Sequence, residues 1–170
     1  MHDLQLQTPR LLLRRARLED ADDLHAAFSD PEVMRYWSTA SHRAIEETRA
    51  WVERMVNASP EVCDDFVIEE AGRVIGKAGF WRLPEVGFLL RRDRWGQGLM
   101  FEALTAVLGH VFRVRQLEEA IADVDPRNVA SLTLLARLGF QERGRRARTI
   151  CVEGIWCDSV DLVLPRPAAR

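Results

Sequence analysis

The chain has 170 residues, of which 47% are hydrophobic and 29% charged, with a formal net charge of −2 at pH 7. This composition is typical of one folded domain with a real core, and it excludes a disordered chain. The balanced charge excludes the basic surface that nucleic acids require, and the longest apolar stretches are too short to span a bilayer. We therefore expect neither a nucleic-acid partner nor a membrane partner.

The cysteines and the N-terminus predict a cytoplasmic protein. Cys63, Cys151 and Cys157 are odd in number and match no zinc-ligand spacing. The first residues lack the basic and apolar regions of an export signal. We therefore expect reduced thiols rather than a disulfide framework. The four histidines are scattered along the chain, so no metal site is expected.

The first half of the chain predicts a strand, three helical segments and then an antiparallel hairpin. The expected strand covers residues 11–17, and the helical segments cover 19–28, 31–36 and 44–56. The last of these places Ile45, Thr48, Trp51, Val52 and Met55 on one face. Strands over 66–69 and 74–81 flank a short turn at 71–73, and a further strand covers 86–90.

The second half contains the only pattern that demands a parallel crossover. A glycine loop at 95–98 is followed by a helix whose apolar residues recur from Met100 to Phe112, then by a strand over 120–124. A helix over 128–138 ends at Gly139, and two long strands over 140–164 turn at 153–154. One βαβ unit among hairpins predicts a mixed, mostly antiparallel sheet of six or seven strands with helices on both faces.

The glycine loop Trp95-Gly96-Gln97-Gly98 suggests an anion site. Glycine allows a ligand to approach the backbone closely, and the unpaired N–H groups of a helix start favour phosphate. Three arginines just upstream add positive charge. The loop is neither a Walker motif nor a GxGxxG fingerprint, because the required lysine and third glycine are absent. On its own, such a loop is more often a plain turn into a helix.

Several further motifs resemble those of the GNAT acetyltransferase superfamily, and in particular its RimJ/RimL-like N-acetyltransferases. They are Thr8-Pro9-Arg10-Leu11-Leu12-Leu13-Arg14, Asp30-Pro31-Glu32-Val33-Met34-Arg35-Tyr36-Trp37, Glu85-Val86-Gly87-Phe88, Asn128-Val129-Ala130-Ser131, Gly139-Phe140 and Trp156-Cys157-Asp158. The resemblance spans residues 8–164 and implies a single GNAT domain over 1–170. It implies direct transfer of the acetyl group of acetyl-CoA to a primary amine. The alternative is a CoA-binding module with weak or no catalysis.

The resemblance also implies how acetyl-CoA is held. The pantetheine arm would pair with Phe88, Leu89 and Leu90, and the sheet would split beside this strand. The pyrophosphate would lie on the backbone amides of Trp95, Gly96, Gln97, Gly98, Leu99 and Met100. The family usually has Arg or Gln in place of Trp95 and Gly or Ala in place of Met100. Because the loop acts mainly through its backbone, these departures matter little.

The implied catalytic residues are Glu85 and Ser131. Glu85 would be the base that takes the proton of the attacking amine, and Ser131 would protonate the leaving thiolate. Asn128 would bind the pantetheine arm. The plain alternatives are a solvated hairpin carboxylate, a serine in a first helical turn, and a helix N-cap. A tyrosine used by many relatives is replaced by Leu135, and a glutamate that some relatives carry near 149–151 is missing.

The acceptor is left open by the sequence. Arg35, Tyr36 and Trp37 lie in the segment expected to bind it, and their bulk favours a flat or peptide-like molecule. A protein N-terminus, as in ribosomal-protein modification, and a small amine are both compatible. A homodimer is possible, because the long terminal strands and Trp156 offer apolar surface.

Overall fold

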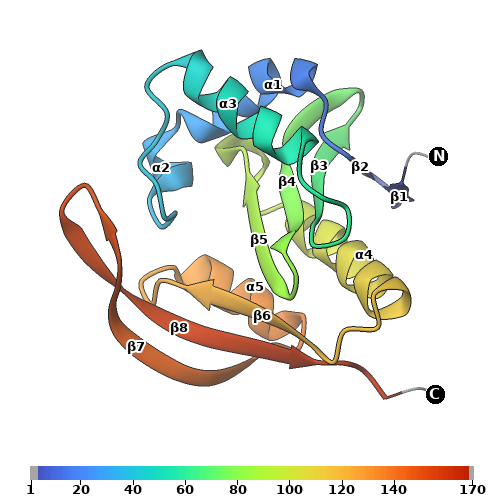
Figure 1. Cartoon of the computed structure of the whole chain (residues 1–170), viewed down its shortest axis with the longest axis vertical. Helices are drawn as coiled ribbons and strands as arrows, with labels where there is room; N and C mark the ends of the chain where they lie inside the picture. The colour runs from blue at the N-terminus through green and yellow to red at the C-terminus, as the bar shows by residue number, and fades with distance from the viewer. Residues whose placement is uncertain (1–3, 169–170) are drawn as a thin grey trace.

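The computed structural model of the protein describes residues 4–168, and within them eight strands form one mixed sheet in the order β1-β2-β3-β4-β5-β6-β8-β7 (Figure 1). The strands are β1 (Gln5–Gln7), β2 (Leu12–Arg14), β3 (Asp64–Glu70), β4 (Arg73–Arg82), β5 (Glu85–Leu90), β6 (Glu119–Val124), β7 (Gln141–Val152) and β8 (Ile155–Pro165). The helices are α1 (Ala21–Phe28), α2 (Pro31–Met34), α3 (Ile45–Val56), α4 (Leu99–Val114) and α5 (Val129–Arg137), with short 3-10 turns at Leu18–Asp20 and Arg92–Arg94.

The fold class is confirmed, and only the number of strands differs. Eight strands are present where six or seven were expected, because β1 pairs with β2 ahead of the predicted first strand. A three-residue strand is too short to show an alternating pattern. The predicted strand over 11–17 is shortened to β2, since the side chain of Asp20 accepts a hydrogen bond from the Arg17 N–H and a 3-10 turn begins there.

Helices α1, α2 and α3 cover one face of the β1–β5 part of the sheet, and α4 covers the other (Figure 1). Leu24, Phe28 and Val52 of the first layer pack on Val67 and Leu89 of the sheet. The predicted apolar face of α3 is the face that is buried. On the opposite side, the apolar stripe of α4 joins α5, β6 and β8 in a second, larger core.

The sheet splits between β5 and β6. These strands are parallel, and Glu85 opposite Ile121 is their only paired position, with the Ile121 N–H donating to the Pro84 carbonyl at 2.9 Å. Beyond this point β5 and β6 diverge, which confirms the expected split (Figure 1). The backbone groups of β5 on the side facing β6 are therefore available to a ligand.

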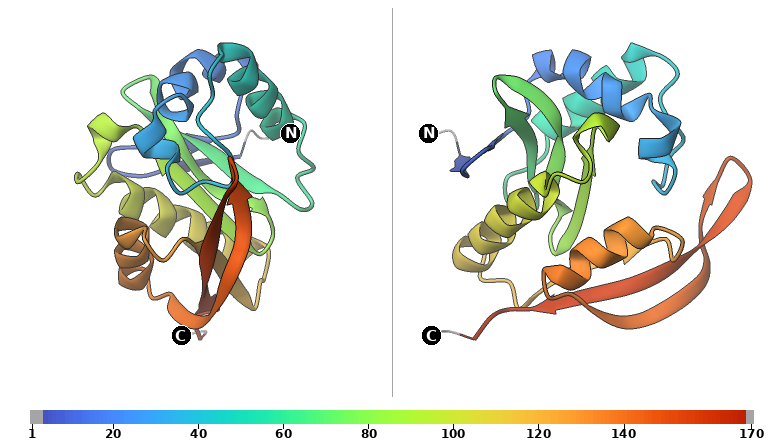
Figure 2. Two further views of the ribbon diagram at one scale, coloured as in Figure 1. Left: turned by 90° about the vertical axis from the view of Figure 1, so that its left-hand side faces the viewer. Right: turned by 180° about the vertical axis from the view of Figure 1, so that it is seen from behind.

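The hairpin of β7 and β8 extends beyond the rest of the sheet and curves toward the segment between α2 and α3 (Figure 2). Its tip carries Glu153, which lies 3.3 Å from Arg43 of that segment. Ile155 and Trp156 beside the tip are exposed. Within the described residues, no helix is long and apolar enough to cross a membrane.

Candidate active site

The split opens a cavity of about 570 Å³ that passes from one face of the sheet to the other. On one face it is lined by the start of α4, the glycine loop and α5. On the other it is lined by Tyr36 and Trp37 at the end of α2 and by Ile150 of β7. The diverging edges of β5 and β6 form its sides. Two groups entering from opposite faces could therefore meet inside the sheet.

The glycine loop has the backbone that an anion site requires. Gly96 and Gly98 adopt φ angles of 72° and 75°, and Gly98 precedes the first turn of α4. Side chains rarely adopt this left-handed conformation, which explains why glycine occupies both positions. Trp95 donates a hydrogen bond from its indole Nε1 to the Leu90 carbonyl at 2.8 Å. It thus ties the loop to the end of β5.

The loop is braced by the N-terminal segment, which sequence reasoning did not anticipate. Arg10 donates a hydrogen bond to the Gln97 carbonyl at 2.9 Å and forms an ion pair with Glu102 of α4 at 2.7 Å. Thr8 donates to the same carboxylate at 2.6 Å. Burial alone would raise the pKa of Glu102, but the hydrogen bonds from Thr8 and Arg10 hold it below its ordinary value. Glu102 is therefore ionised at neutral pH.

The three arginines before the loop carry less free charge than the sequence suggested. Each is paired with a carboxylate: Arg91 with Asp93 at 3.0 Å, Arg92 with Asp30 at 3.1 Å and Arg94 with Glu70 at 2.9 Å. Of the three, only Arg94 lines the cavity. Arg137 of α5 also lines it, with its guanidinium 4.8 Å from the centre of the Phe101 ring. No carboxylate partner of Arg137 occurs within residues 4–168.

Helix α5 presents Asn128 and Ser131 to the cavity. Asn128 is the N-cap, and its side-chain oxygen accepts a hydrogen bond from the Ser131 N–H at 3.1 Å. The capping role is therefore real, and the side-chain NH₂ is left for a ligand. Leu135 is fully buried in the larger core and does not line the cavity.

Glu32, Asp123 and Asp125 are the carboxylates on the cavity wall, and Glu32 and Asp125 are paired with Arg35 and Arg127. Glu85 and Asp123 differ in their position relative to the split. Glu85 is half-buried at the closed end, where β5 and β6 pair, and it is not among the cavity-lining residues. Asp123 of β6 lies two residues beyond the paired Ile121 and lines the cavity. Its Oδ2 is 2.9 Å from Arg146, which binds Asp161 more closely through two nitrogens at 2.6 and 2.7 Å. One guanidinium thus serves two carboxylates.

The α2 end of the cavity is built from side chains. Trp37 contacts the rings of Phe28 and Trp51 edge to face, with centroid distances of 6.3 and 6.0 Å. Two guanidinium groups lie against the ring of Tyr36, Arg35 at 5.5 Å and Arg127 at 5.8 Å. The second contact joins the two sides of the split, since Arg127 follows β6.

The cavity brings together most of the residues named from the sequence. All lie on its wall except Gln97, which contributes its carbonyl to Arg10, and Glu85. Sequence reasoning missed Asp123 and Arg137. The alternation of β6 could have found Asp123, because Ala120, Ala122 and Val124 are buried and the intervening positions face the other way. Within residues 4–168, no three acidic, histidine or cysteine side chains are grouped as a metal site.

Comparison with known proteins identifies relatives of this architecture. Residues 10–141 match the family described as the acetyltransferase (GNAT) domain. The chain is 33% identical over 148 residues to the uncharacterized N-acetyltransferase p20 of Bacillus licheniformis, covering 82% of this chain and 83% of that protein. It is 27% identical over 178 residues to the ribosomal protein uS5-alanine N-acetyltransferase of Escherichia coli strain K12, covering 96% and 92%.

Solved structures share the fold at lower identity. The microcin C7 self-immunity acetyltransferase MccE, in complex with acetyl-CoA and AMP, superposes with a TM-score of 0.83. The match covers 93% of each chain at 14% identity, so the likeness concerns the fold alone.

Proposed function

We propose that this protein, which belongs to the acetyltransferase (GNAT) family and is an acetyl-CoA-dependent N-acetyltransferase, works through a ternary complex. In this complex acetyl-CoA, the donor, and the amine, the acceptor, are bound together inside the split sheet. The observation that carries this proposal is the single cavity lined on both faces of the sheet. The donor enters from the side of α4 and α5, and the amine from the side of α2. Holding both reactants in line supplies much of the rate.

The donor half fits acetyl-CoA through backbone groups and one cation without a carboxylate partner. The amides of the glycine loop at the start of α4 suit a pyrophosphate, because unpaired N–H groups and the helix dipole favour negative charge there. The free edge of β5 at Phe88, Leu89 and Leu90 offers hydrogen bonds to the amides of the pantetheine arm. Arg137, which has no carboxylate partner within residues 4–168, adds positive charge to the wall, whereas the charge of Arg94 is matched by Glu70.

The acceptor half supplies a carboxylate for the amine. Because Asp123 and Asp161 share Arg146, this part of the wall keeps a net negative charge that favours an ammonium group. Asp123 would hold the ammonium and take a proton from it, directly or through water, and the neutral amine would then attack the thioester carbon. Glu85 remains the prediction from the sequence, but its place outside the cavity favours Asp123.

Ser131 would act on the leaving group. It lines the cavity from the first turn of α5, and no hydrogen bond of its hydroxyl is found within residues 4–168. As the C–S bond breaks, the hydroxyl can donate a hydrogen bond to the thiolate. Thiolates leave readily near neutral pH, so this contribution is smaller than that of the base.

A protein N-terminus is the acceptor that the relatives favour, since the Escherichia coli relative acts on an alanine of ribosomal protein uS5. A cytoplasmic location belongs to this proposal. A small amine is the alternative. The protruding β7–β8 hairpin and exposed Trp156 also support a homodimer, and a monomeric mass by light scattering at micromolar concentration would exclude it.

The deciding experiment is a thiol-release assay with N-terminal peptides and small amines, with both substrates varied. A ternary complex gives intersecting double-reciprocal lines, whereas an acyl-enzyme gives parallel lines. Acetyl-CoA binding by calorimetry without turnover of any amine would instead support the CoA-binding module.

A further inference from the structure

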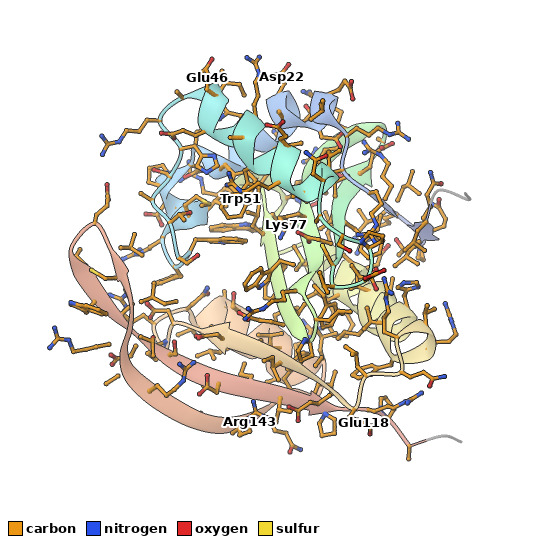
Figure 3. All side chains as sticks on the ribbon, viewed as in Figure 1. Asp22, Glu46, Trp51, Lys77, Glu118 and Arg143 are labelled. Atoms are coloured by element: carbon orange, nitrogen blue, oxygen red, sulfur yellow. The ribbon has the colours of Figure 1, made fainter. Side chains whose placement is uncertain are left out.

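Lys77 is the only lysine of the chain, and it is buried. It lies in the middle of β4, with 2% of its surface exposed, opposite Val67 of β3 and Leu89 of β5. Figure 3 shows it in the interior of the molecule, in the region below α3. Burying the charge of a lysine in an apolar core costs free energy of folding unless a partner of opposite charge compensates for it.

One carboxylate matches the charge. Asp65 of β3 is also buried, and its Oδ2 lies 2.8 Å from the Lys77 Nζ. The other oxygen of Asp65 has no hydrogen-bond partner in the described part of the chain. A buried ion pair with unsatisfied atoms is seldom the most stable solution for a core, because apolar residues of the same size often serve as well. The pair is therefore weak evidence for stability, and its contacts on the cavity side need an explanation of their own.

The Lys77 ammonium also faces the cavity wall. Its Nζ lies over the indole ring of Trp37, 5.6 Å from the ring centre, at a distance where the cation attracts the aromatic face. Trp37 lines the acceptor half of the cavity, and Phe28 and Trp51 hold it edge to face. Lys77 thus adds a charge beneath a ring that is already confined at its edges.

Strand β4, which carries Lys77, packs closely against β5, whose residues line the cavity. A Cβ added to the neighbouring Gly76 would collide with the carbonyl oxygen of Leu89, so β4 and β5 approach closely here. Leu89 lines the cavity and is the residue of β5 that pairs with Lys77, so the backbone of Lys77 lies directly beside the cavity wall.

We propose that Lys77 is a positioning residue for the acceptor, whose buried ammonium, balanced by Asp65, holds the Trp37 indole as a fixed wall of the acceptor half. This inference rests on the proposed function. Lys77 itself does not line the cavity, so it acts through Trp37. It is expected to affect acceptor binding and to leave acetyl-CoA binding unchanged.

The test replaces the whole ion pair, because Lys77→Met alone would strand the Asp65 charge and unfold the chain. In Lys77→Met/Asp65→Leu, the acceptor KM should rise about three- to thirtyfold, from the usual strength of a cation–π contact. The acetyl-CoA Kd should stay at the wild-type value. If this variant does not fold, Lys77→Gln/Asp65→Asn, which keeps hydrogen bonding but no charge, serves the same test.

The same substitutions made in a Trp37→Leu variant show whether Lys77 positions Trp37 or only stabilises the fold. Trp37→Leu should raise the acceptor KM by itself, and adding Lys77→Met/Asp65→Leu to it should raise the KM no further. Independent, multiplicative increases would overturn the proposal, as would an unchanged KM in the folded ion-pair variant. A general loss of stability would lower the unfolding midpoint without producing this dependence on Trp37.

The position of Trp37 can be followed without activity. Acrylamide quenching of Trp37 fluorescence, taken as the difference between each protein and its Trp37→Leu counterpart, should increase when the ion pair is removed. If the wild-type chain turns over no amine, the proposed function fails, but the quenching measurement still tests whether Lys77 holds Trp37 in place. Unchanged quenching would then refute this role of Lys77.

Discussion

The donor half and the acceptor half of the cavity are built in different ways. The donor half is formed by two continuous segments, 86–101 and 128–137, and in the proposed function it works mainly through backbone amides and a helix start. The acceptor half is formed by side chains of Tyr36, Trp37, Asp123 and Ile150, which meet only in the folded chain. A site made of backbone tolerates changes of side chain, whereas a site made of side chains can change its specificity without changing the fold.

The largest effect is expected at the proton acceptor of the acceptor half. Asp123→Asn should lower kcat/KM by about 10²–10⁴-fold, since a proton-transfer group typically contributes this much. Acetyl-CoA affinity should hold, and the loss should shrink at high pH, where more of the amine is already neutral. Initial rates over a range of pH provide the measurement.

Two matched variants sharpen this result. Asp161→Asn alters the same arginine network outside the cavity and should cost far less. Glu85→Gln should remain close to the wild type. If Glu85→Gln instead shows the larger, pH-dependent loss, the base lies at the closed end of the split and the assignment of Asp123 is wrong.

In the donor half, the backbone of Gly98 is the most sensitive point. Gly98→Val forces a branched side chain into a φ near 75°, and this strain should weaken CoA binding about ten- to a hundredfold. Calorimetry on the folded variant measures it. Gly109→Ala in α4, where an added Cβ meets open space, is the control: it should keep the affinity and stabilise the helix by up to about 1 kcal/mol. Unchanged affinity of Gly98→Val would contradict a backbone-made site.

Asn128 allows the helix cap and the ligand contact to be separated. Asn128→Ala should lower stability by about 1 kcal/mol through loss of the cap. Asn128→Ser keeps a capping oxygen but removes the amide NH₂, so stability should hold while CoA affinity falls about two- to tenfold. Thermal unfolding and calorimetry report the two effects. Full affinity in Asn128→Ser would leave Asn128 with the capping role alone.

The smallest effect concerns pH and the acceptor wall. Burial lowers the pKa of His42, which stacks on Phe28 at 4.8 Å, below its ordinary value of 6.5. The unfolded chain therefore takes up the proton first, so the stability contribution of His42 is complete above about pH 6.5 and declines as the pH falls. Urea unfolding of His42→Phe should accordingly depend less on pH between 7 and 5 than that of the wild type. An equally steep decline in both proteins would place the acid sensitivity elsewhere, for example at His110.

The elements could be predicted from the sequence because they depend on local patterns. The residues of the donor half were named from local motifs and the family resemblance, and their binding of acetyl-CoA stays a prediction. The glycine loop, the cap at Asn128 and the apolar stripe of α4 each lie within one short continuous segment of the sequence. The residues of the acceptor half come from distant segments, so they could not be predicted from local patterns. Asp123 reaches the cavity only because β6 diverges from β5 beyond Ile121. Lys77 contacts the cavity wall only because Trp37, 40 positions earlier in the chain, lies against it in the folded structure. Glu85 was chosen from a motif, but the pairing of β5 and β6 places it at the closed end.

The contacts of Arg10 with the glycine loop make acetyl-CoA binding sensitive to proteolysis of the segment around residues 8–10. The loop that faces the donor is held by a segment close to the N-terminus, through Arg10 and through Thr8 on Glu102. A cut after Arg10 would leave α4 and both glycines intact, yet it would free the loop and should weaken acetyl-CoA binding, although Gln97 lies 87 positions further along the chain. A preparation that loses affinity for acetyl-CoA on storage should therefore be checked by mass spectrometry for a cut between Thr8 and Leu11.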